Sequence, residues 1–142
     1  MSASTDKAGG ELSLSKLLAT LTTVLHEPTY VFITLPYTKP LPPLPEVHML
    51  FRETEGITLI TTLDVAIAHG YEYQYECKKI TLNVHSSLEA VGFMATVATR
   101  LAKNGISVNP VSAYFHDHIF VPVGKEDVTV RLLGELAKEN GN

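Results

Sequence analysis

Leucine residues near the start of the chain recur at helical spacing, and a strand-like segment follows them. The members of this apolar stripe are Leu14, Leu17, Leu18, Leu21 and Leu25. Their i, i+3, i+4, i+7 and i+11 spacing predicts one helix. Ser13 fits its N-cap position, and Pro28 ends the pattern. Residues 30–35 are dense in β-branched and aromatic side chains and predict a strand.

The next part of the chain predicts a hairpin between two breaker-rich segments. Residues 36–45 hold five of the eight prolines. They predict a stiff surface loop, with a segment for proline-binding domains as the alternative. Residues 47–52 and 57–61 are strand-like, and residues 53–56 predict a hairpin loop closed by a glycine at positive φ. Residues 62–70 predict a short helix with a glycine at its C′ position.

The second half of the chain gives a clearer succession of a strand, a helix and another strand. Residues 71–84 predict one long strand or two abutting strands, because apolar and polar residues alternate there. Ser86 and Glu89 have the spacing of a capping box and predict a helix that runs to about residue 104. The expected buried stripe of this helix is Leu88, Val91, Ala95, Ala98 and Ala102.

A hairpin and a last helix are predicted to close the chain. Residues 106–115 predict a strand that lies on an edge or is bulged at Pro110, because proline cannot donate a ladder hydrogen bond. Residues 116–118, HDH, predict a turn before the returning strand 119–123. An apolar face over 126–138 predicts the last helix.

Each half of the chain is incomplete as a folding unit. The second half predicts β-α-β-β-α, which is a ferredoxin-like unit without its closing strand. The first half predicts α-β-β-β-α and is not self-contained either. We therefore expect a strand to cross between the halves, so that residues 30–35 or the first part of 71–84 complete the sheet of the other half.

Composition narrows the function classes. The chain has 142 residues with a formal net charge of −4, which argues against a nucleic-acid binder. No apolar run reaches the roughly 18 residues of a membrane span, and residues 1–11 lack the apolar core of a signal peptide. A single cysteine, Cys77, excludes an internal disulfide and a thiolate metal cluster. These features predict a cytoplasmic protein with no nucleic-acid or membrane partner.

Three segments resemble the ACT-domain superfamily. Residues 81–92, TLNVHSSLEAVG, and 105–122, GISVNPVSAYFHDHIFVP, are similar to tandem ACT-like proteins of uncharacterised function. Residues 51–60, FRETEGITLI, are similar to the first half of that group, so the resemblance covers about residues 12–139. The chain is also similar to the paired ACT modules of aspartate kinases, which exchange strands between modules.

The resemblance implies an α+β, ferredoxin-like fold of two interlocked βαββαβ modules, with antiparallel sheets and helices on one face. Residues 12–72 are then the first module and 73–142 the second, and residues 1–11, which are small and polar, are expected to be a disordered tail. It also implies a small amino-acid-type ligand, regulatory rather than catalytic work, and a homodimer.

The ligand of an ACT domain commonly lies beside the loop from the first strand to the first helix, often at a module or subunit interface. The residues carried over to that position, with their neighbours, are Asn83, His85, Ser86, Ser87, Leu88, Val91 and Gly92. A helix N-terminus exposes free N–H groups that suit a carboxylate. The facing strand offers Asn109, Ser112 and Tyr114. The alternatives are that Ser86 only caps the helix and that Gly92 only permits close packing. Many amino-acid-binding ACT domains carry Asp or Asn in this loop, so the absence of both here leaves the ligand's identity open.

Metal and catalytic chemistry are not expected. The imidazoles and carboxylate of residues 116–118 are ligand types for zinc or iron, but neighbouring side chains on a turn point apart. No GxSxG, GxGxxG or GxxxxGK[ST] motif occurs, and Cys77 is expected to be an inert thiol. The expected function is therefore non-enzymatic and cofactor-free binding of a small amino-acid-type molecule by a regulatory protein. The alternatives are an interaction module that has lost its ligand, and a His- or metal-dependent enzyme.

Overall fold

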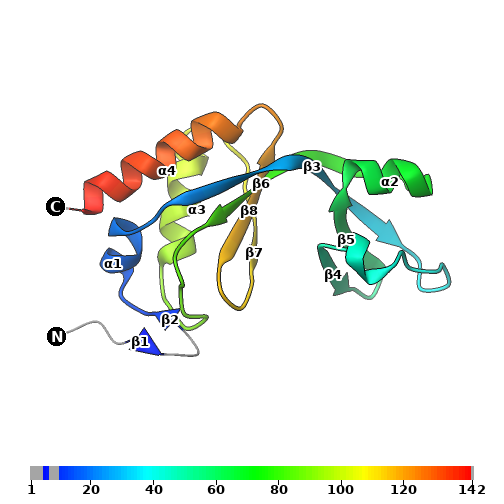
Figure 1. The fold of residues 1–142 in the computed structure, drawn as a ribbon, viewed down its shortest axis with the longest axis horizontal. Coiled ribbons are helices and arrows are strands. Elements are labelled where there is room, and N and C mark those ends of the chain that lie inside the picture. Colours follow the sequence, from blue (N-terminus) through cyan, green and yellow to red (C-terminus); the bar gives the residue numbers. More distant parts are fainter. Residues whose placement is uncertain (1–4, 7–9, 142) are drawn as a thin grey trace. The chain divides into compact units, whose positions relative to one another are not determined.

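The computed structural model describes residues 5–6 and 10–141 (Figure 1). Its elements are β1 (Thr5–Asp6), β2 (Gly10–Glu11), α1 (Leu14–Ala19), β3 (Thr23–Leu35), the short 3₁₀ turn Leu44–Glu46, β4 (Met49–Arg52), β5 (Ile57–Thr62), α2 (Leu63–His69), β6 (Gln74–Leu82), α3 (Phe93–Lys103), β7 (Asn109–Ser112), β8 (Asp117–Pro122) and α4 (Glu126–Asn140). The main sheet has the strand order β4-β5-β3-β6-β8-β7. The expected tail over residues 1–11 lies largely outside the described residues.

The chain forms two compact units that are interleaved in sequence. One unit holds Met1–His26 and Lys79–Asn142, and the other holds Glu27–Lys78. The start of β3 therefore belongs to the first unit, and the start of β6 belongs to the second. One version of the expected exchange is confirmed, because the first part of 71–84 lies in the unit of the other half. The version with residues 30–35 is wrong, since these residues pair with β5 in their own half and the part of β3 before them enters the first unit instead. The expected module boundary between residues 72 and 73 stays a prediction.

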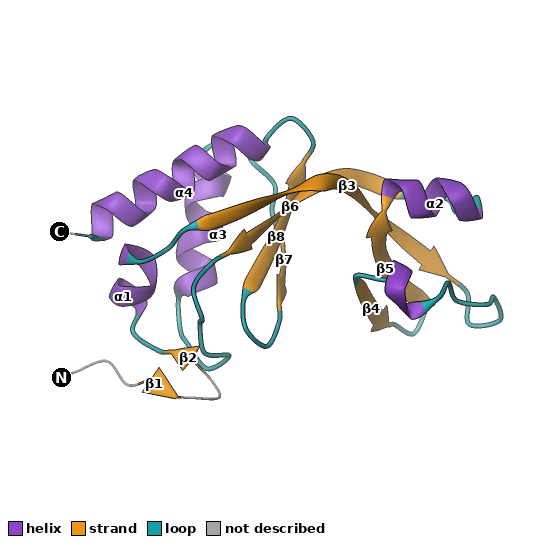
Figure 2. Ribbon diagram, viewed as in Figure 1, coloured by secondary structure: helices purple, strands orange, loops and turns teal. Residues whose placement is uncertain are grey.

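In the first unit, helices cover one face of the sheet (Figure 2). Ile80 and Leu82 of β6 lie two positions apart, as do Ile119 and Val121 of β8, so each pair points to one face of its strand, and all four side chains belong to the same core. They form one core with side chains from α1, α3 and α4, namely Leu17, Leu18, Phe93, Val97, Leu101, Leu132, Leu133 and Leu136. The predicted edge position of the strand with Pro110 is confirmed, because β7 ends the strand order and Pro110 pairs with Ile119.

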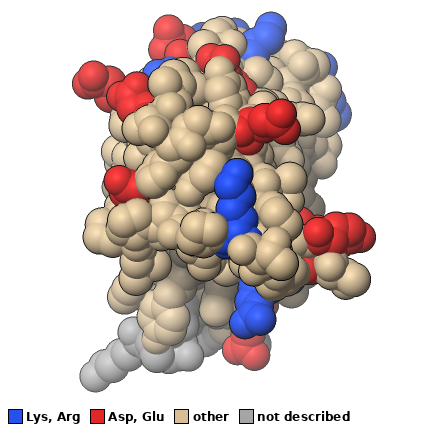
Figure 3. Space-filling view, turned by 90° about the vertical axis from the view of Figure 1, so that its right-hand side faces the viewer, with Lys and Arg blue, Asp and Glu red and all other residues tan. Residues whose placement is uncertain are grey.

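The second unit has its own sheet and core. β5 pairs antiparallel with β3, where Tyr30 faces Thr62, and with β4, where Met49 faces Ile60. The core of this unit consists of Val31, Ile33, Leu35, Ile57, Leu59 and Ala66. The predicted α2 is confirmed: Thr62 Oγ1 accepts a hydrogen bond from the Val65 N–H, and Gly70 ends the helix at φ +68°. Figure 3 views the molecule from the right-hand side of Figure 1, and most of the surface visible there belongs to residues other than Lys, Arg, Asp and Glu.

The first helix is shorter than its leucine spacing predicts. α1 ends at Ala19, and β3 begins at Thr23, so Leu25 lies on a strand and is 41% exposed. Two threonines and a valine, residues 22–24, interrupt the stripe. β-branched side chains lose rotamer freedom in a helix and favour a strand. The helix therefore ends before these residues, although the leucine spacing continues to Leu25.

The predicted capping box at Ser86 and Glu89 is wrong. α3 begins at Phe93 after Gly92, whose φ is +92°. The expected stripe is wrong as well, because Leu88 is 65% exposed and Val91 is 84% exposed. The buried stripe is Phe93, Val97 and Leu101. These larger side chains remove more apolar surface from water than a stripe built mainly of alanine would.

Two turn predictions are also corrected. Gly56 is not among the described glycines with positive φ. A Cβ there would lie 2.9 Å from the carbonyl oxygen of Leu35, so the residue is small because two strands approach closely. The turn expected at residues 116–118 lies instead at residues 113–116, where the Ala113 N–H donates to the His116 carbonyl. Asp117 already belongs to β8 and faces Ser112.

Leu101→Ala is expected to lower the free energy of unfolding by about 2–5 kcal/mol, because it leaves a cavity under α3. Leu44→Ala is the matched control: it deletes the same atoms from a side chain that is 79% exposed. It should change stability by less than about 0.5 kcal/mol. Urea unfolding followed by circular dichroism measures both variants. Equal losses would contradict the buried face assigned to α3.

Candidate functional site

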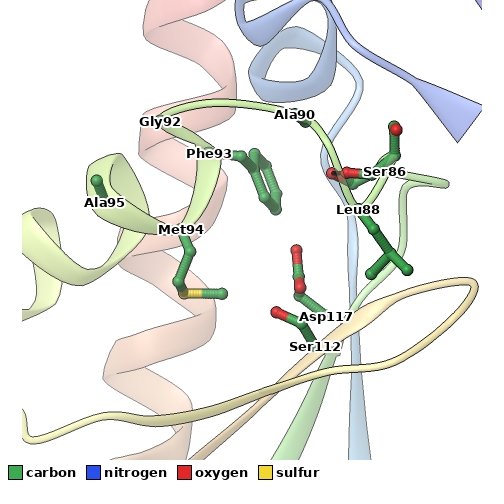
Figure 4. Close-up of a pocket in the computed structure, with 10 residues that line it drawn as sticks. Ser86, Leu88, Ala90, Gly92, Phe93, Met94, Ala95, Ser112 and Asp117 are labelled. Atoms are coloured by element: carbon green, nitrogen blue, oxygen red, sulfur yellow. Dashed lines mark hydrogen bonds between the residues drawn. The ribbon is translucent and has the colours of Figure 1, made fainter.

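A cavity of about 150 Å³ lies in the first unit beside the start of α3. Its walls come from the loop before α3, the first turn of the helix, and the β7–β8 hairpin (Figure 4). The lining residues are Ser86, Ser87, Leu88, Ala90, Gly92, Phe93, Met94, Ala95, Ser112 and Asp117. In Figure 4 the side chains of Met94, Ser112 and Asp117 converge on one space.

The loop before α3 is held by backbone hydrogen bonds to β2. The Glu11 N–H donates to the His85 carbonyl at 2.8 Å, and the Ser87 N–H donates to the Glu11 carbonyl at 3.0 Å. Glu11 also pairs with Ser86 in a parallel bridge. Its carboxylate accepts hydrogen bonds from the Ser13 and Leu12 amides, and that from Ser13 contributes most to lowering the pKa of Glu11. This pairing fixes the wall that carries the two serines.

The start of α3 supplies hydrogen-bond donors to the cavity. The first N–H that donates within the helix is that of Thr96, which bonds to the Gly92 carbonyl at 2.9 Å. The amides of Phe93, Met94 and Ala95 precede it, and no side chain caps them. Free N–H groups and the helix dipole make this wall electropositive, although no basic residue among those that the structure describes lines the cavity.

The opposite wall supplies an acceptor. Asp117 of β8 pairs with Ser112 of β7, and both side chains line the cavity. Among the described residues, no hydrogen bond or ion pair engages the Asp117 carboxylate, which is half-buried. A carboxylate therefore faces uncapped N–H groups across a small space. This arrangement can hold a molecule that carries a positive and a negative group close together.

The structure brings half of the predicted site residues to this cavity. Five of them line it: Ser86, Ser87, Leu88, Gly92 and Ser112. Ser86 and Ser87 are 8% and 7% exposed. The other five do not line it: Asn83, His85, Val91, Asn109 and Tyr114. Their roles in ligand binding stay predictions.

The five non-lining residues have other surroundings. The Asn83 side chain donates to Thr22 Oγ1 at 3.3 Å. The His85 ring lies 5.5 Å from the Phe115 ring, and its buried Nε2 has no hydrogen-bond partner among the described residues. Val91 and Tyr114 are exposed at 84% and 56%. Asn109, also exposed, begins β7.

Asp117 is the main lining residue that the sequence argument missed. The sequence pattern predicts that Asp117 lies in a turn with the two neighbouring histidines. Counting back by two from the buried Val121 and Ile119 puts Asp117 on the same face of β8 as these core residues. That alternation was the available signal. Phe93 and Met94 were missed because the helix start was placed too early.

The three residues of the HDH segment point to different partners. His118 Nδ1 is 2.9 Å from Thr81 Oγ1, and His26 Nε2 is 2.8 Å from the same oxygen. His116 Nδ1 donates to the Val84 carbonyl at 3.0 Å, whereas Asp117 lines the cavity. No three metal-ligating side chains gather anywhere in the described part of the chain.

The histidines that share Thr81 are held in an environment that disfavours their charged forms. Burial lowers the pKa of His118, and the charges of Lys79, His116 and His26 add to this effect while Asp117 opposes it. Burial also lowers the pKa of His26, with a contribution from Lys79. A neutral imidazole is therefore the favoured form at both positions near neutral pH.

Cys77 is buried in the second unit. Its Sγ donates to the Tyr30 carbonyl at 3.3 Å, and burial raises the pKa of the thiol to about 12. The thiol is thus protonated at neutral pH, and a protonated thiol is a poor nucleophile.

Comparison with known proteins gives the class of the chain. A family model described as ACT domain matches residues 9–78, and a second model with the same description matches residues 72–135. No curated protein matches the sequence. Within residues 5–6 and 10–141, no helix is long and apolar enough to cross a membrane.

Solved structures agree with the family models. A protein of unknown function from Vibrio cholerae, titled a possible transport protein, is 40% identical over 87% of this chain and 95% of its own, with a TM-score of 0.75. A protein from Agrobacterium tumefaciens is 17% identical over 82% and 89%, with a TM-score of 0.69. The ligand-free regulatory subunit of aspartate kinase from Thermus thermophilus is 14% identical over 84% and 97%, with a TM-score of 0.60. The chain belongs to the ACT-domain family and carries two ACT domains in tandem.

The free energy of unfolding is expected to fall as the pH is lowered from about 8 to about 5. Because the folded-state pKa values of His118 and His26 are depressed, the unfolded chain binds protons more readily. The stability contributed by these groups is present above the unfolded histidine pKa and is lost as the pH falls toward the folded value. Replacing both histidines with Gln should flatten this dependence in urea unfolding. A slope unchanged by the double substitution would assign it to other groups.

Proposed function

We propose that the protein is a non-enzymatic regulatory protein that binds a small amino-acid-type ligand in the cavity at the start of α3. The observation that carries the proposal is the opposition of the Asp117 carboxylate and the uncapped amides of Phe93, Met94 and Ala95. An amino acid carries an ammonium and a carboxylate on one carbon. Asp117 suits the ammonium, and the helix start suits the carboxylate.

The size of the cavity limits the side chain of the ligand. A volume of about 150 Å³ equals that of an engineered cavity known to hold a benzene molecule. It accommodates the backbone of an amino acid with a small side chain. The hydroxyls of Ser87 and Ser112 offer further hydrogen bonds, and Met94 offers a flexible apolar contact.

A regulatory role is supported by the family and by the engaged state of the reactive side chains. ACT domains are regulatory modules, and a structural neighbour is a regulatory subunit. The thiol of Cys77 is protonated, and His26 and His118 are hydrogen-bonded to Thr81, so none of them is poised as a nucleophile or base. The proposal includes a cytoplasmic location.

The regulatory signal is proposed to pass through a homodimer. Two loops of the first unit, 85–92 and 113–116, expose large apolar side chains at Leu88, Val91, Tyr114 and Phe115, which are 65%, 84%, 56% and 59% exposed. The Phe115 ring lies 4.8 Å from the Tyr114 ring and 5.5 Å from the His85 ring of the other loop, and exposed apolar surface of this kind is typical of interfaces. Since Leu88 also lines the cavity, a ligand that fixes this loop would favour one arrangement of the dimer by differential affinity.

At least one small amino acid is expected to raise the thermal midpoint of the protein in a screen of all twenty, because a ligand that prefers the folded form stabilises it. Asp117→Asn should weaken that binding about ten- to hundred-fold, since it removes the charge of a charge-assisted hydrogen bond. Asp127→Asn, on the exposed first turn of α4, is the matched control. Titration calorimetry measures each affinity.

Two further variants test the loop itself. Gly92→Leu should abolish the response and also lower stability, because a leucine is strained at φ +92°. Ser87→Ala should weaken the response with less loss of stability. Unchanged affinity in both would show that the loop is not the binding site. If no amino acid at millimolar concentration raises the thermal midpoint, the result favours an interaction module that has lost its ligand. Stoichiometric zinc or iron in protein purified without a histidine tag would favour a metal-dependent enzyme.

The double variant Val91→Ser, Phe115→Ser is expected to shift the protein from dimer to monomer, because it removes two exposed apolar side chains from the proposed interface. Leu44→Ser, in the exposed 3₁₀ turn, should leave the assembly unchanged. Sedimentation equilibrium gives the mass of each variant. A wild-type protein that stays monomeric at high micromolar concentration would contradict the dimer.

A further inference from the structure

A second and larger cavity lies in the second unit, on the sheet face opposite α2. Val31 and Ile33 of β3 face the core with Ala66 of α2, so Phe32 and Thr34 point to the other face. Thr34 pairs with Thr58 of β5, and both line this cavity. Its volume of about 650 Å³ lies within the range of sites for small organic molecules.

The cavity has an aromatic wall with an unusual backbone beside it. Phe32 and Tyr73 line it. The Phe32 ring meets the Tyr75 ring edge to face, with 5.8 Å between centroids. Tyr75 is the one non-glycine residue at positive φ, +64°, in the described part of the chain. A bulky residue in this region is strained, and strain of this kind gathers at functional sites.

The polar groups of the cavity are acidic. Glu53 and Glu72 line it, whereas no Lys, Arg or His does so among the described residues. Two hydrogen bonds hold Glu53 in place. Its carboxylate accepts one from the Thr58 hydroxyl, and its backbone carbonyl accepts one from the Tyr37 hydroxyl at 2.6 Å. The guanidinium of the adjacent Arg52 lies over the Tyr37 ring, 6.0 Å from its centroid.

We propose that this cavity binds a small organic cation with an apolar body. The ammonium or guanidinium group lies between Glu53 and Glu72, and the apolar body packs on Phe32 and Tyr73. Aromatic faces attract cations, and two carboxylates without a basic neighbour in the lining complement a positive charge. This site is separate from the cavity at the start of α3, and the inference stands independently of the function proposed for that cavity.

Phenethylamine and phenylacetate are matched probes for this test, because they share a phenyl body and carry opposite charges. Amide resonances of the ¹⁵N-labelled protein report where each one binds. Phenethylamine at millimolar concentration is expected to shift resonances of residues 32–34, 53–58 and 72–74 in a saturable way. Phenylacetate should leave them unchanged. Absence of a phenethylamine response, or an equal response to phenylacetate, would overturn the proposal.

Single substitutions test the two carboxylates. Glu53 and Glu72 are exposed, so Glu72→Gln and Glu53→Gln should each weaken phenethylamine binding about two- to five-fold, as expected for a solvent-exposed charge pair. Glu55→Gln, in the same exposed hairpin loop but outside the cavity lining, is the matched control. The spectra of the free variants verify folding. Equal phenethylamine affinity in all three variants would overturn the proposal. Self-association through this face that phenethylamine does not dissociate would also overturn it.

Discussion

The left-handed backbone at Gly92 determines where α3 starts, and the cavity of the first unit depends on that start. With φ at +92°, the chain leaves the loop and enters the helix only at Phe93. The buried stripe then falls on Phe93, Val97 and Leu101, and the uncapped amides of the first turn face Asp117. A helix that began at Ser87 would have consumed the same amides in internal hydrogen bonds. The donors of the site are therefore a consequence of a late helix start.

The loop needs a second constraint, because a glycine alone does not fix six residues of chain. β2 provides it through backbone hydrogen bonds between Glu11 and both His85 and Ser87. These bonds join residues more than seventy positions apart, so no local pattern announces them. A capping-box spacing at Ser86 and Glu89 indicated a helix, but the pairing with β2 takes the Ser87 amide, and the Ser87 hydroxyl bonds the Glu89 amide instead.

The sequence carries the fold further than it carries the site. Strand-like runs separated by loop residues located both hairpins, and a short helical segment followed by Gly70 located α2, because these signals are local. The ACT resemblance led to the loop of residues 85–92, of which four predicted members line the cavity. Asp117 was accessible through the alternation of β8 but was hidden by its two histidine neighbours. His118 lies on the opposite face of β8 and is hydrogen-bonded to Thr81. His116 precedes the strand and donates to the Val84 carbonyl.

The proposed regulation through the first cavity requires that a ligand bind two states unequally, and we propose that the loop of residues 85–92 is the element that differs between them. Its ends are tied by Glu11 and by the first turn of α3, while Leu88 and Val91 between them are exposed. Fixing those side chains costs conformational entropy, and we propose that a ligand which contacts Leu88 shares this cost with a partner surface that covers Val91. Each binding event then lowers the cost of the other. In the proposed dimer, linkage requires that a ligand which strengthens the dimer bind more tightly to the dimer than to the monomer by the same factor, so one coupling free energy describes both effects.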